Sequence, residues 1–183
     1  MDPQQLPPEL AEAVRFHGHL CPGLLIGYRA ALAARQALGL GRSQDEEITA
    51  VVENDSCSVD AIQALLGATF GKGNLKWLDH GKQVFTITDR KRNRAVRVAF
   101  VGDGLRPRKS DGSVDREAFV EILLQEPDQR LLKVEEVAPA PPALARIEPS
   151  VPCGRCGEMV QESKTVLRNG QAYCRACARE MGR

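Results

Sequence analysis

The chain has 183 residues, of which 25 are basic and 24 acidic, so its formal net charge is only +1. This balance excludes a global field that would draw the protein to nucleic acid or to an anionic membrane surface. The length allows one domain with a real hydrophobic core plus a small appendage. The start of the chain lacks the basic and apolar regions of a signal peptide, and no segment approaches the roughly 20 apolar residues of a membrane span. We therefore expect a cytoplasmic protein with no membrane association.

The first element is a short helix at residues 9–16, which leads into a motif at residues 15–23 that concentrates metal-binding side chains. His17, His19 and Cys21 are spaced by two, and an extended backbone would project all three from one face. This pattern predicts a three-ligand fork. A proline follows Cys21 and suits the first turn of a helix, so the helix N-terminus should favour the Cys21 thiolate.

A long helix at residues 22–38 follows, with a single apolar stripe that a glycine closes. After a polar turn, the β-branched run at residues 48–53 predicts a strand. Capping residues then begin a second amphipathic helix, which ends near Gly67.

Cys57 lies at the junction between this strand and this helix, so it too is predicted near a helix N-terminus. The carboxyl ends of strands are where α/β-type proteins often build sites. We therefore take Cys57 as a candidate nucleophile or metal ligand. Glu53 and Asp60 flank it and are the candidates for proton transfer.

A glycine-rich stretch at residues 67–75 comes next. Its backbone amides, with Lys72 and Asn74, are candidates for binding an anionic cofactor. The spacing does not fit a phosphate-binding loop, and glycines that only permit tight turns are the favoured interpretation.

Two strands at residues 84–88 and 95–101 are predicted to form a hairpin. The basic loop at residues 106–112 is interpreted as a solvated loop, with guidance of an anionic ligand as the alternative. A helix begins at Asp115, and a last strand covers residues 131–137. Because strands and helices alternate without a regular βαβ repeat, the predicted fold class is α+β, with a mixed sheet and packed helices.

A segment rich in proline and alanine marks a domain boundary. We assign residues 1–137 to the core domain, 138–150 to a linker and 151–183 to a small zinc ribbon of treble-clef-like type. The ribbon holds two CxxC pairs with 17 residues between them, a spacing typical of a structural zinc site. The four predicted zinc ligands are Cys153, Cys156, Cys174 and Cys177.

The two remaining cysteines and the histidine motif predict a second site in the core. His17, His19, Cys21 and Cys57 would suit zinc or another borderline-soft divalent metal, and an open coordination position would make the ion reactive. The alternative needs no metal, because a Cys57 activated by a helix terminus and a histidine would be a redox or nucleophilic thiol. His80 is interpreted as a turn residue without a role.

Three separated motifs stand out together, namely residues 16–24 with Gly27 and Arg29, residues 53–63, and residues 71–75 followed by Asp79, Gly81 and Lys82. In this order they resemble the E-subunit family of formylmethanofuran dehydrogenase. The similarity covers about residues 12–134, and family members often carry a C-terminal zinc ribbon. One departure is Ala68, where the family commonly has a cysteine.

The resemblance implies an α+β core, a homodimer and a groove lined by cysteine and histidine. It does not imply dehydrogenase activity for this chain, because the molybdenum or tungsten pterin of the parent enzyme is carried by a different subunit. Our leading hypothesis is a metal-binding accessory or free-standing relative, associated with one-carbon and redox metabolism. The alternative is an interaction module whose zinc ribbon docks on a protein partner. Nucleic acid is the less favoured partner, because the ribbon has few aromatic residues for base stacking.

Overall fold

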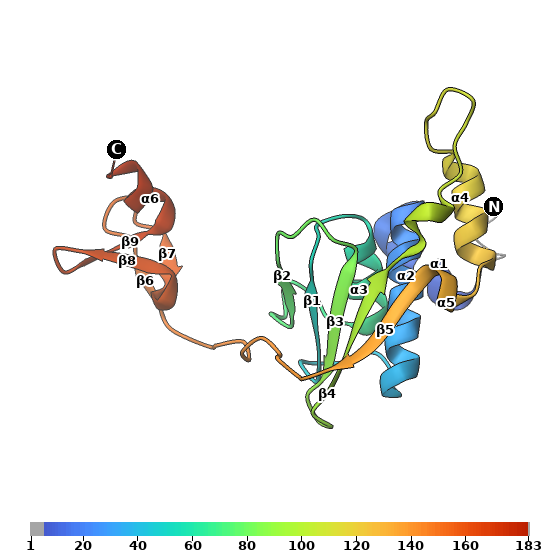
Figure 1. Cartoon of the computed structure of the whole chain (residues 1–183). Coiled ribbons are helices and arrows are strands. Elements are labelled where there is room, and N and C mark those ends of the chain that lie inside the picture. The colour runs from blue at the N-terminus through green and yellow to red at the C-terminus, as the bar shows by residue number, and fades with distance from the viewer. Residues whose placement is uncertain (1–5, 183) are drawn as a thin grey trace. The chain divides into compact units, whose positions relative to one another are not determined.

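The computed structural model describes residues 6–182, so the first five residues, on which the expectation about a signal peptide partly rests, lie outside the described part of the chain. The chain forms two compact units, the first reaching Leu144 and the second beginning at Ala145 (Figure 1). This boundary falls inside the segment predicted as a linker. None of the helices in residues 6–182 combines the length and the apolar character needed to cross a bilayer.

The first unit contains a five-stranded mixed sheet with strand order β2-β1-β3-β4-β5. The β1–β2 pair is parallel, and the other neighbours are antiparallel. The predicted hairpin is β3–β4, and the mixed sheet confirms the predicted α+β class. The strands are β1 (Ile48–Val52), β2 (Leu75–Trp77), β3 (Val84–Asp89), β4 (Arg94–Phe100) and β5 (Leu132–Val137).

Helices cover one face of this sheet, with α2 packed against β3, β4 and β5 (Figure 1). Helix α2 begins after Cys21 with a proline in its first turn, and it ends at Gly39 in a left-handed conformation, as predicted. The helices of this unit are α1 (Pro8–His17), α2 (Pro22–Leu38), α3 (Ser58–Leu66), α4 (Arg116–Gln125) and α5 (Asp128–Leu131), with a 3₁₀ turn, η2 (Gly102–Leu105).

The core lies between α2 and the sheet. Phe85 and Val98 are fully buried and face each other across the β3–β4 pair. Helix α2 is buried more completely than a single stripe allows, since Ala30, Ala31 and Ala34 are also inaccessible to solvent. The predicted stripe was too narrow because α1, α3 and α4 pack against other sides of the same helix.

The second unit consists of two small hairpins and a short helix (Figure 1). An Asn-Gly pair in the sequence predicts a tight hairpin turn, and Asn169 and Gly170 both have positive φ and form the turn between β8 and β9. The elements are β6 (Ser150–Pro152), β7 (Met159–Gln161), η3 (Glu162–Lys164), β8 (Thr165–Arg168), β9 (Gln171–Cys174) and α6 (Arg175–Glu180).

Candidate metal centres

Three donor side chains meet at one end of the first unit. His17 Nε2 or Nδ1 and the Sγ atoms of Cys21 and Cys57 form a group whose ligand atoms all lie within 4.8 Å of one another. His17 is the last residue of α1, Cys21 caps the N-terminus of α2, and Cys57 precedes α3. Three elements therefore each contribute one ligand to a single group.

Two glycines in α2 allow this convergence. A Cβ atom at Gly27 would lie 2.0 Å from the backbone oxygen of Ser58, and one at Gly23 would lie 3.1 Å from the Cβ of Cys57. Only glycine lets the start of α3 approach α2 so closely. The close approach of the two helices brings the Cys21 and Cys57 thiols together.

Asp60 fixes the orientation of His17. The His17 Nδ1–H donates to the Asp60 carboxylate at 2.7 Å, which leaves the lone pair on Nε2 facing the cysteines. Nε2 lies 3.8 Å from Cys21 Sγ. Nitrogen and sulfur ligands of a tetrahedral zinc ion lie roughly 3.5–3.8 Å apart, so the spacing already fits a shared ion.

The structure does not favour a thiolate at Cys57. Burial raises the pKa of the Cys57 thiol, and the neighbouring Cys21 raises it further. The alternative of a Cys57 thiol activated by the helix terminus therefore receives no support, because desolvation and a second thiol outweigh the helix dipole. Two adjacent thiols in a half-buried site favour shared protons, and a divalent cation would replace those protons.

The extended fork predicted for the histidine motif is not formed. His17 is helical, and Gly18 ends α1 in a left-handed conformation with φ 101°. His19 is therefore turned out of the ligand group. Its exposed ring lies beside that of His17, with 4.6 Å between the ring centroids.

Glu53 contacts basic side chains from the β2–β3 connection and from β4. Its carboxylate accepts from His80 Nδ1 at 3.1 Å and lies 3.8 Å from Arg97, with Lys82 at 3.9 Å. These contacts give Glu53 a structural ion-pair role and do not support the predicted proton transfer at Cys57. The sequence interpretation also missed the contact of His80 with Glu53, because a single histidine in a turn does not indicate which residue it will bind.

Lys72 and Asn74 bind the polypeptide itself. Lys72 Nζ donates to the backbone oxygens of Gln44 and Asp45 at 3.3 and 2.9 Å. Asn74 is fully buried, and its side chain bonds the backbone of Ile48 and Thr69. We assign both residues a structural role, and their predicted cofactor binding receives no support.

A hydrogen-bond network behind Cys57 was also missed. Asn54 Oδ1 accepts from the Ser56 hydroxyl at 2.8 Å and lies 3.1 Å from the Ser58 hydroxyl oxygen. Gln83, which immediately precedes β3, donates to Ser56 Oγ and accepts from Ser58 Oγ, both at 2.8 Å. The network fixes the loop that carries Cys57. Its members were not recognisable in the sequence because Gln83 lies 25 residues away from Ser58.

The second group of donors lies in the C-terminal unit, where the two predicted CxxC pairs converge. Hydrogen bonds from the backbone N–H groups of Cys156, Arg155 and Cys174 lower the pKa of Cys153 to about 6. A hydrogen bond with the Cys174 side chain, together with burial, raises the pKa of Cys177 to about 12. One thiolate thus forms readily, and a cation would compensate the charge of the others. The four Sγ atoms that lie within 4.8 Å of one another are those of Cys153, Cys156, Cys174 and Cys177.

Comparison with known proteins identifies the family. Residues 16–136 match the sequence model described as FmdE, molybdenum formylmethanofuran dehydrogenase operon. The chain belongs to the FmdE family. The matched region contains all three members of the core ligand group and stops before the second unit, so the core group belongs to the family domain.

Two relatives extend the comparison. The chain is 30% identical to a probable S-adenosyl-L-methionine-binding protein of Archaeoglobus fulgidus over 92% of its own length, and it spans only 52% of that protein. The crystal structure of a tungsten formylmethanofuran dehydrogenase FmdE-like protein from Syntrophus aciditrophicus superposes with a TM-score of 0.64 at 23% identity. That match covers 91% of this chain and 88% of the other. It shows that the two proteins share a fold.

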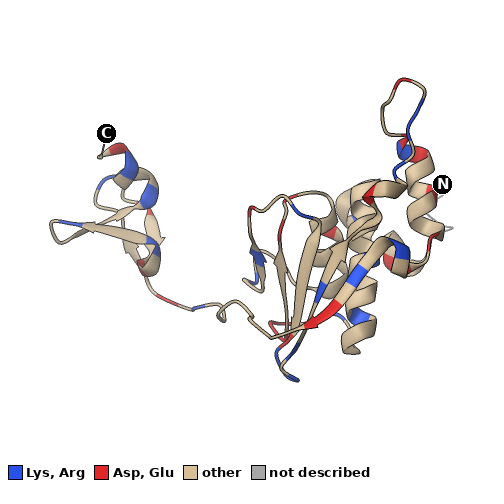
Figure 2. Ribbon diagram, in the orientation of Figure 1, with Lys and Arg blue, Asp and Glu red and all other residues tan. Residues whose placement is uncertain are grey.

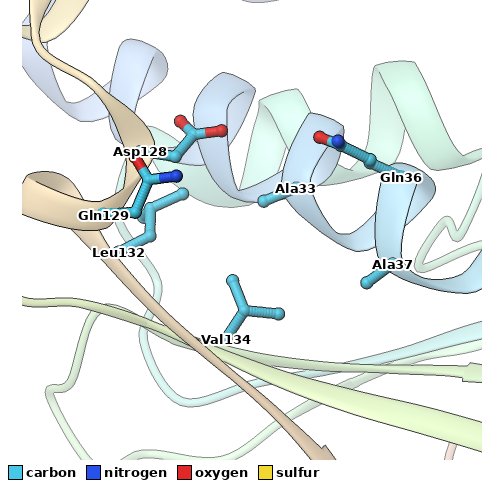
Figure 3. A pocket seen from close by; sticks show the side chains of 7 residues that line it. All are labelled: Ala33, Gln36, Ala37, Asp128, Gln129, Leu132 and Val134. Atoms are coloured by element: carbon cyan, nitrogen blue, oxygen red, sulfur yellow. The ribbon is translucent and has the colours of Figure 1, made fainter.

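A cavity of about 420 Å³ lies between α2 and the α5–β5 segment, away from the core ligand group of His17, Cys21 and Cys57 (Figure 3). Among the described residues, Asp128 is the one ionisable side chain in its lining, and Arg29 pairs with that carboxylate at 2.6 Å. The cavity therefore lacks a free reactive group, and the group of His17, Cys21 and Cys57 remains the better candidate site.

Proposed function

We propose that this FmdE-family protein binds a divalent metal ion through His17, Cys21 and Cys57, and a structural zinc ion through its four C-terminal cysteines. The observation that supports the core site most strongly is the meeting of three donors from three elements. Asp60 adds to it, because a carboxylate that orients a histidine is typical of metal sites. His19, which we predicted as a fourth ligand, is left out of this proposal.

The two sites differ in their chemistry. Four thiolates around one ion form a closed shell that stabilises a small fold, and the second unit has little apolar core of its own. One histidine and two cysteines leave a fourth position open in the core site. An open position allows an ion to bind and polarise a small molecule, so the core site is the candidate for reactivity. Zinc or another borderline-soft divalent ion suits these donors.

We further propose that the protein works in the cytoplasm as a homodimer, and that it is an accessory or free-standing relative of the formylmethanofuran dehydrogenase component FmdE. Family membership and the donor groups support an association with one-carbon or redox metabolism. We do not extend S-adenosyl-L-methionine binding to this chain, because it spans about half of the Archaeoglobus protein that carries that description.

Metal content per chain, measured by elemental analysis, tests this proposal. We expect two ions in the full-length protein and one in Cys57→Ser. The matched variant Cys153→Ser/Cys156→Ser should lose the other ion and keep the core ion. If Cys57→Ser retained the full metal content while the ribbon variant lost all of it, the core site would have to be abandoned.

A second candidate function, docking through the zinc ribbon, is favoured by its exposed apolar side chains. Met159 is 65% exposed and Leu167 is 71% exposed, both on hairpins of the second unit. Large apolar side chains on a surface are available for contact with a protein partner. Co-purification from the native host tests this function. A protein partner that co-purifies with the parent chain should no longer co-purify with Leu167→Ser. Equal recovery with both chains would count against this use of the ribbon.

A further inference from the structure

A cavity of about 400 Å³ lies beside the core ligand group. Cys21 and Cys57 contribute to its wall, so the open position of the ion would face a bounded space. Its charged lining residues are Arg106 and Arg116, while His19 adds a titratable ring. Among the described residues, no carboxylate lines this cavity. The charged side chains that line the space next to the proposed ion are therefore basic.

The fold brings the two arginines to the same cavity. They lie at the two ends of a projecting loop whose neck is closed by a bridge between Arg108 and Val114, with the Asp115 N–H donating to the Pro107 backbone oxygen at 2.9 Å. Figure 2 shows this loop above α4, with basic residues at its base. The solvated loop predicted from the sequence thus has an ordered neck that sets the position of both guanidinium groups.

The two arginines differ in availability. Arg106 pairs with Asp103 at 2.6 Å and lies over the Phe119 ring, 5.2 Å from its centroid. Arg116 is the first residue of α4 and makes no ion pair or side-chain hydrogen bond in residues 6–182. Glu117 and Glu121 share a neighbouring hollow with Arg116, but they do not line the cavity beside Cys57. Arg116 is thus the cation available to a ligand.

We infer that this cavity binds a small organic carboxylate. Its carboxylate would bind the ion and pair with Arg116, while Pro22 and Val114, the accessible apolar side chains of the wall, would contact its apolar part. Arginine recognises carboxylates through charge-assisted hydrogen bonds. The apolar wall favours an organic anion over an inorganic one. This inference rests on the proposed core metal site.

Cobalt-substituted full-length protein provides the test, because its visible absorption reports the coordination of the ion. We expect a saturable spectral change on titration with phenylacetate, and none with the neutral phenylacetamide. Inorganic phosphate should bind at least about tenfold more weakly than phenylacetate. The ion held by the four C-terminal cysteines has a closed shell and should not respond, so Cys57→Ser should abolish the change.

Variants at the loop isolate the role of Arg116. Arg116→Gln should weaken phenylacetate binding about tenfold or more, as expected for loss of a charge-assisted bond. Arg116→Lys should retain most of the affinity. Lys109→Gln, in the same loop but outside the cavity lining, should bind like the parent. Metal content, measured on every variant, should not change in these three.

The outcomes separate this inference from the proposed function. Two ions per chain with no response to phenylacetate, or an equal response in Arg116→Gln, would overturn the carboxylate site and leave the metal site standing. Phosphate binding as tight as phenylacetate binding would overturn the assignment to an organic anion. If the protein held no core ion and did not respond to phenylacetate, both the core metal site and the carboxylate site would be overturned.

Discussion

At the scale of single residues, the core site depends on how one histidine is held. His17 presents Nε2 to the cysteines because Nδ1 is bonded to Asp60, and the His17 side chain is only 11% exposed. Carboxylates that orient a metal-binding histidine commonly contribute about tenfold to a hundredfold in metal affinity. Asp60 is therefore interpreted as a positioning residue, in place of the proton-transfer role suggested by the sequence.

Replacing Asp60 with asparagine tests this role. We expect Asp60→Asn to weaken binding at the core site by about tenfold to a hundredfold, because the neutral amide polarises His17 less. Competition with a chromophoric chelator measures the affinity. Asp55→Asn is the matched control, since Asp55 is exposed in the neighbouring loop. Equal affinities of the two variants would show that Asp60 does not act through His17.

A second residue-scale prediction concerns Glu47. Hydrogen bonds from the backbone N–H groups of Gln44, Glu47 itself and Asp45 lower the pKa of Glu47 to about 2. A lowered pKa means that the ionised form stabilises the fold above the unfolded pKa, near 4.5, and that this stability is lost as the pH falls towards 2. Glu47→Gln should therefore cost about 1 kcal/mol at pH 7, after allowance for solvent screening.

Chemical denaturation at pH 7 and at pH 3 measures this difference. The cost of Glu47→Gln should shrink at pH 3, where part of the charge-dependent stability is already lost in the parent. Glu121→Gln serves as the control, because Glu121 is exposed and lies outside this hydrogen-bonded turn. A cost for Glu47→Gln that is the same at both pH values would contradict the assignment.

At the scale of elements, the contact between α2 and α3 builds the ligand group. Gly27→Ala would place a methyl group 2.0 Å from the Ser58 backbone oxygen, so the helices would have to separate. We expect a loss of about 2–3 kcal/mol in the free energy of unfolding, as for other overpacked cores. Core metal binding should weaken as well, because Cys21 and Cys57 would move apart.

Urea denaturation and metal titration of Gly27→Ala check both parts of this prediction. Gly41→Ala is a suitable control, since a Cβ atom there would meet no other atom within 4 Å. Stability and metal affinity like those of the control would mean that the close helix contact is not required for the site.

Another element-scale prediction concerns the junction of α4 and α5. The Arg29 side chain from α2, only 14% exposed, donates to the Asp128 carboxylate and to the backbone oxygens of Leu123 and Glu126. Arg29→Met should cost about 2 kcal/mol because it leaves two backbone oxygens and a partly exposed carboxylate without their partner. Arg35→Met, which removes a single side-chain bond of 3.4 Å, should cost much less in the same denaturation experiment. Similar costs would show that the junction does not depend on Arg29.

At the scale of the whole molecule, the chain divides into two compact units, and we predict that they fold independently. Trp77, the single tryptophan of the chain, lies on β2 and reports on the first unit. In Cys153→Ser/Cys156→Ser the melting temperature detected by Trp77 fluorescence should stay close to that of the parent. A large decrease would show that the metal-bound second unit stabilises the first.

Many elements of the fold followed from local sequence alone. The proline and glycine that bound α2, the β3–β4 hairpin and the turn at Asn169 depend on residues close to one another, and the structure confirms them. The spacing of the CxxC pairs also indicated that the four cysteines converge. Such features are encoded locally, because backbone conformation and capping depend on near neighbours.

Only the tertiary structure decided the composition of the core site. The sequence indicated His17, His19, Cys21 and Cys57 as a set, but the end of α1 at Gly18 turned His19 outward and the Gly27 contact brought Cys57 in. The same holds for Glu53, whose partners lie in the β2–β3 connection and on β4. These contacts join residues far apart in the chain, and they form through packing of whole helices and strands, which local patterns do not specify.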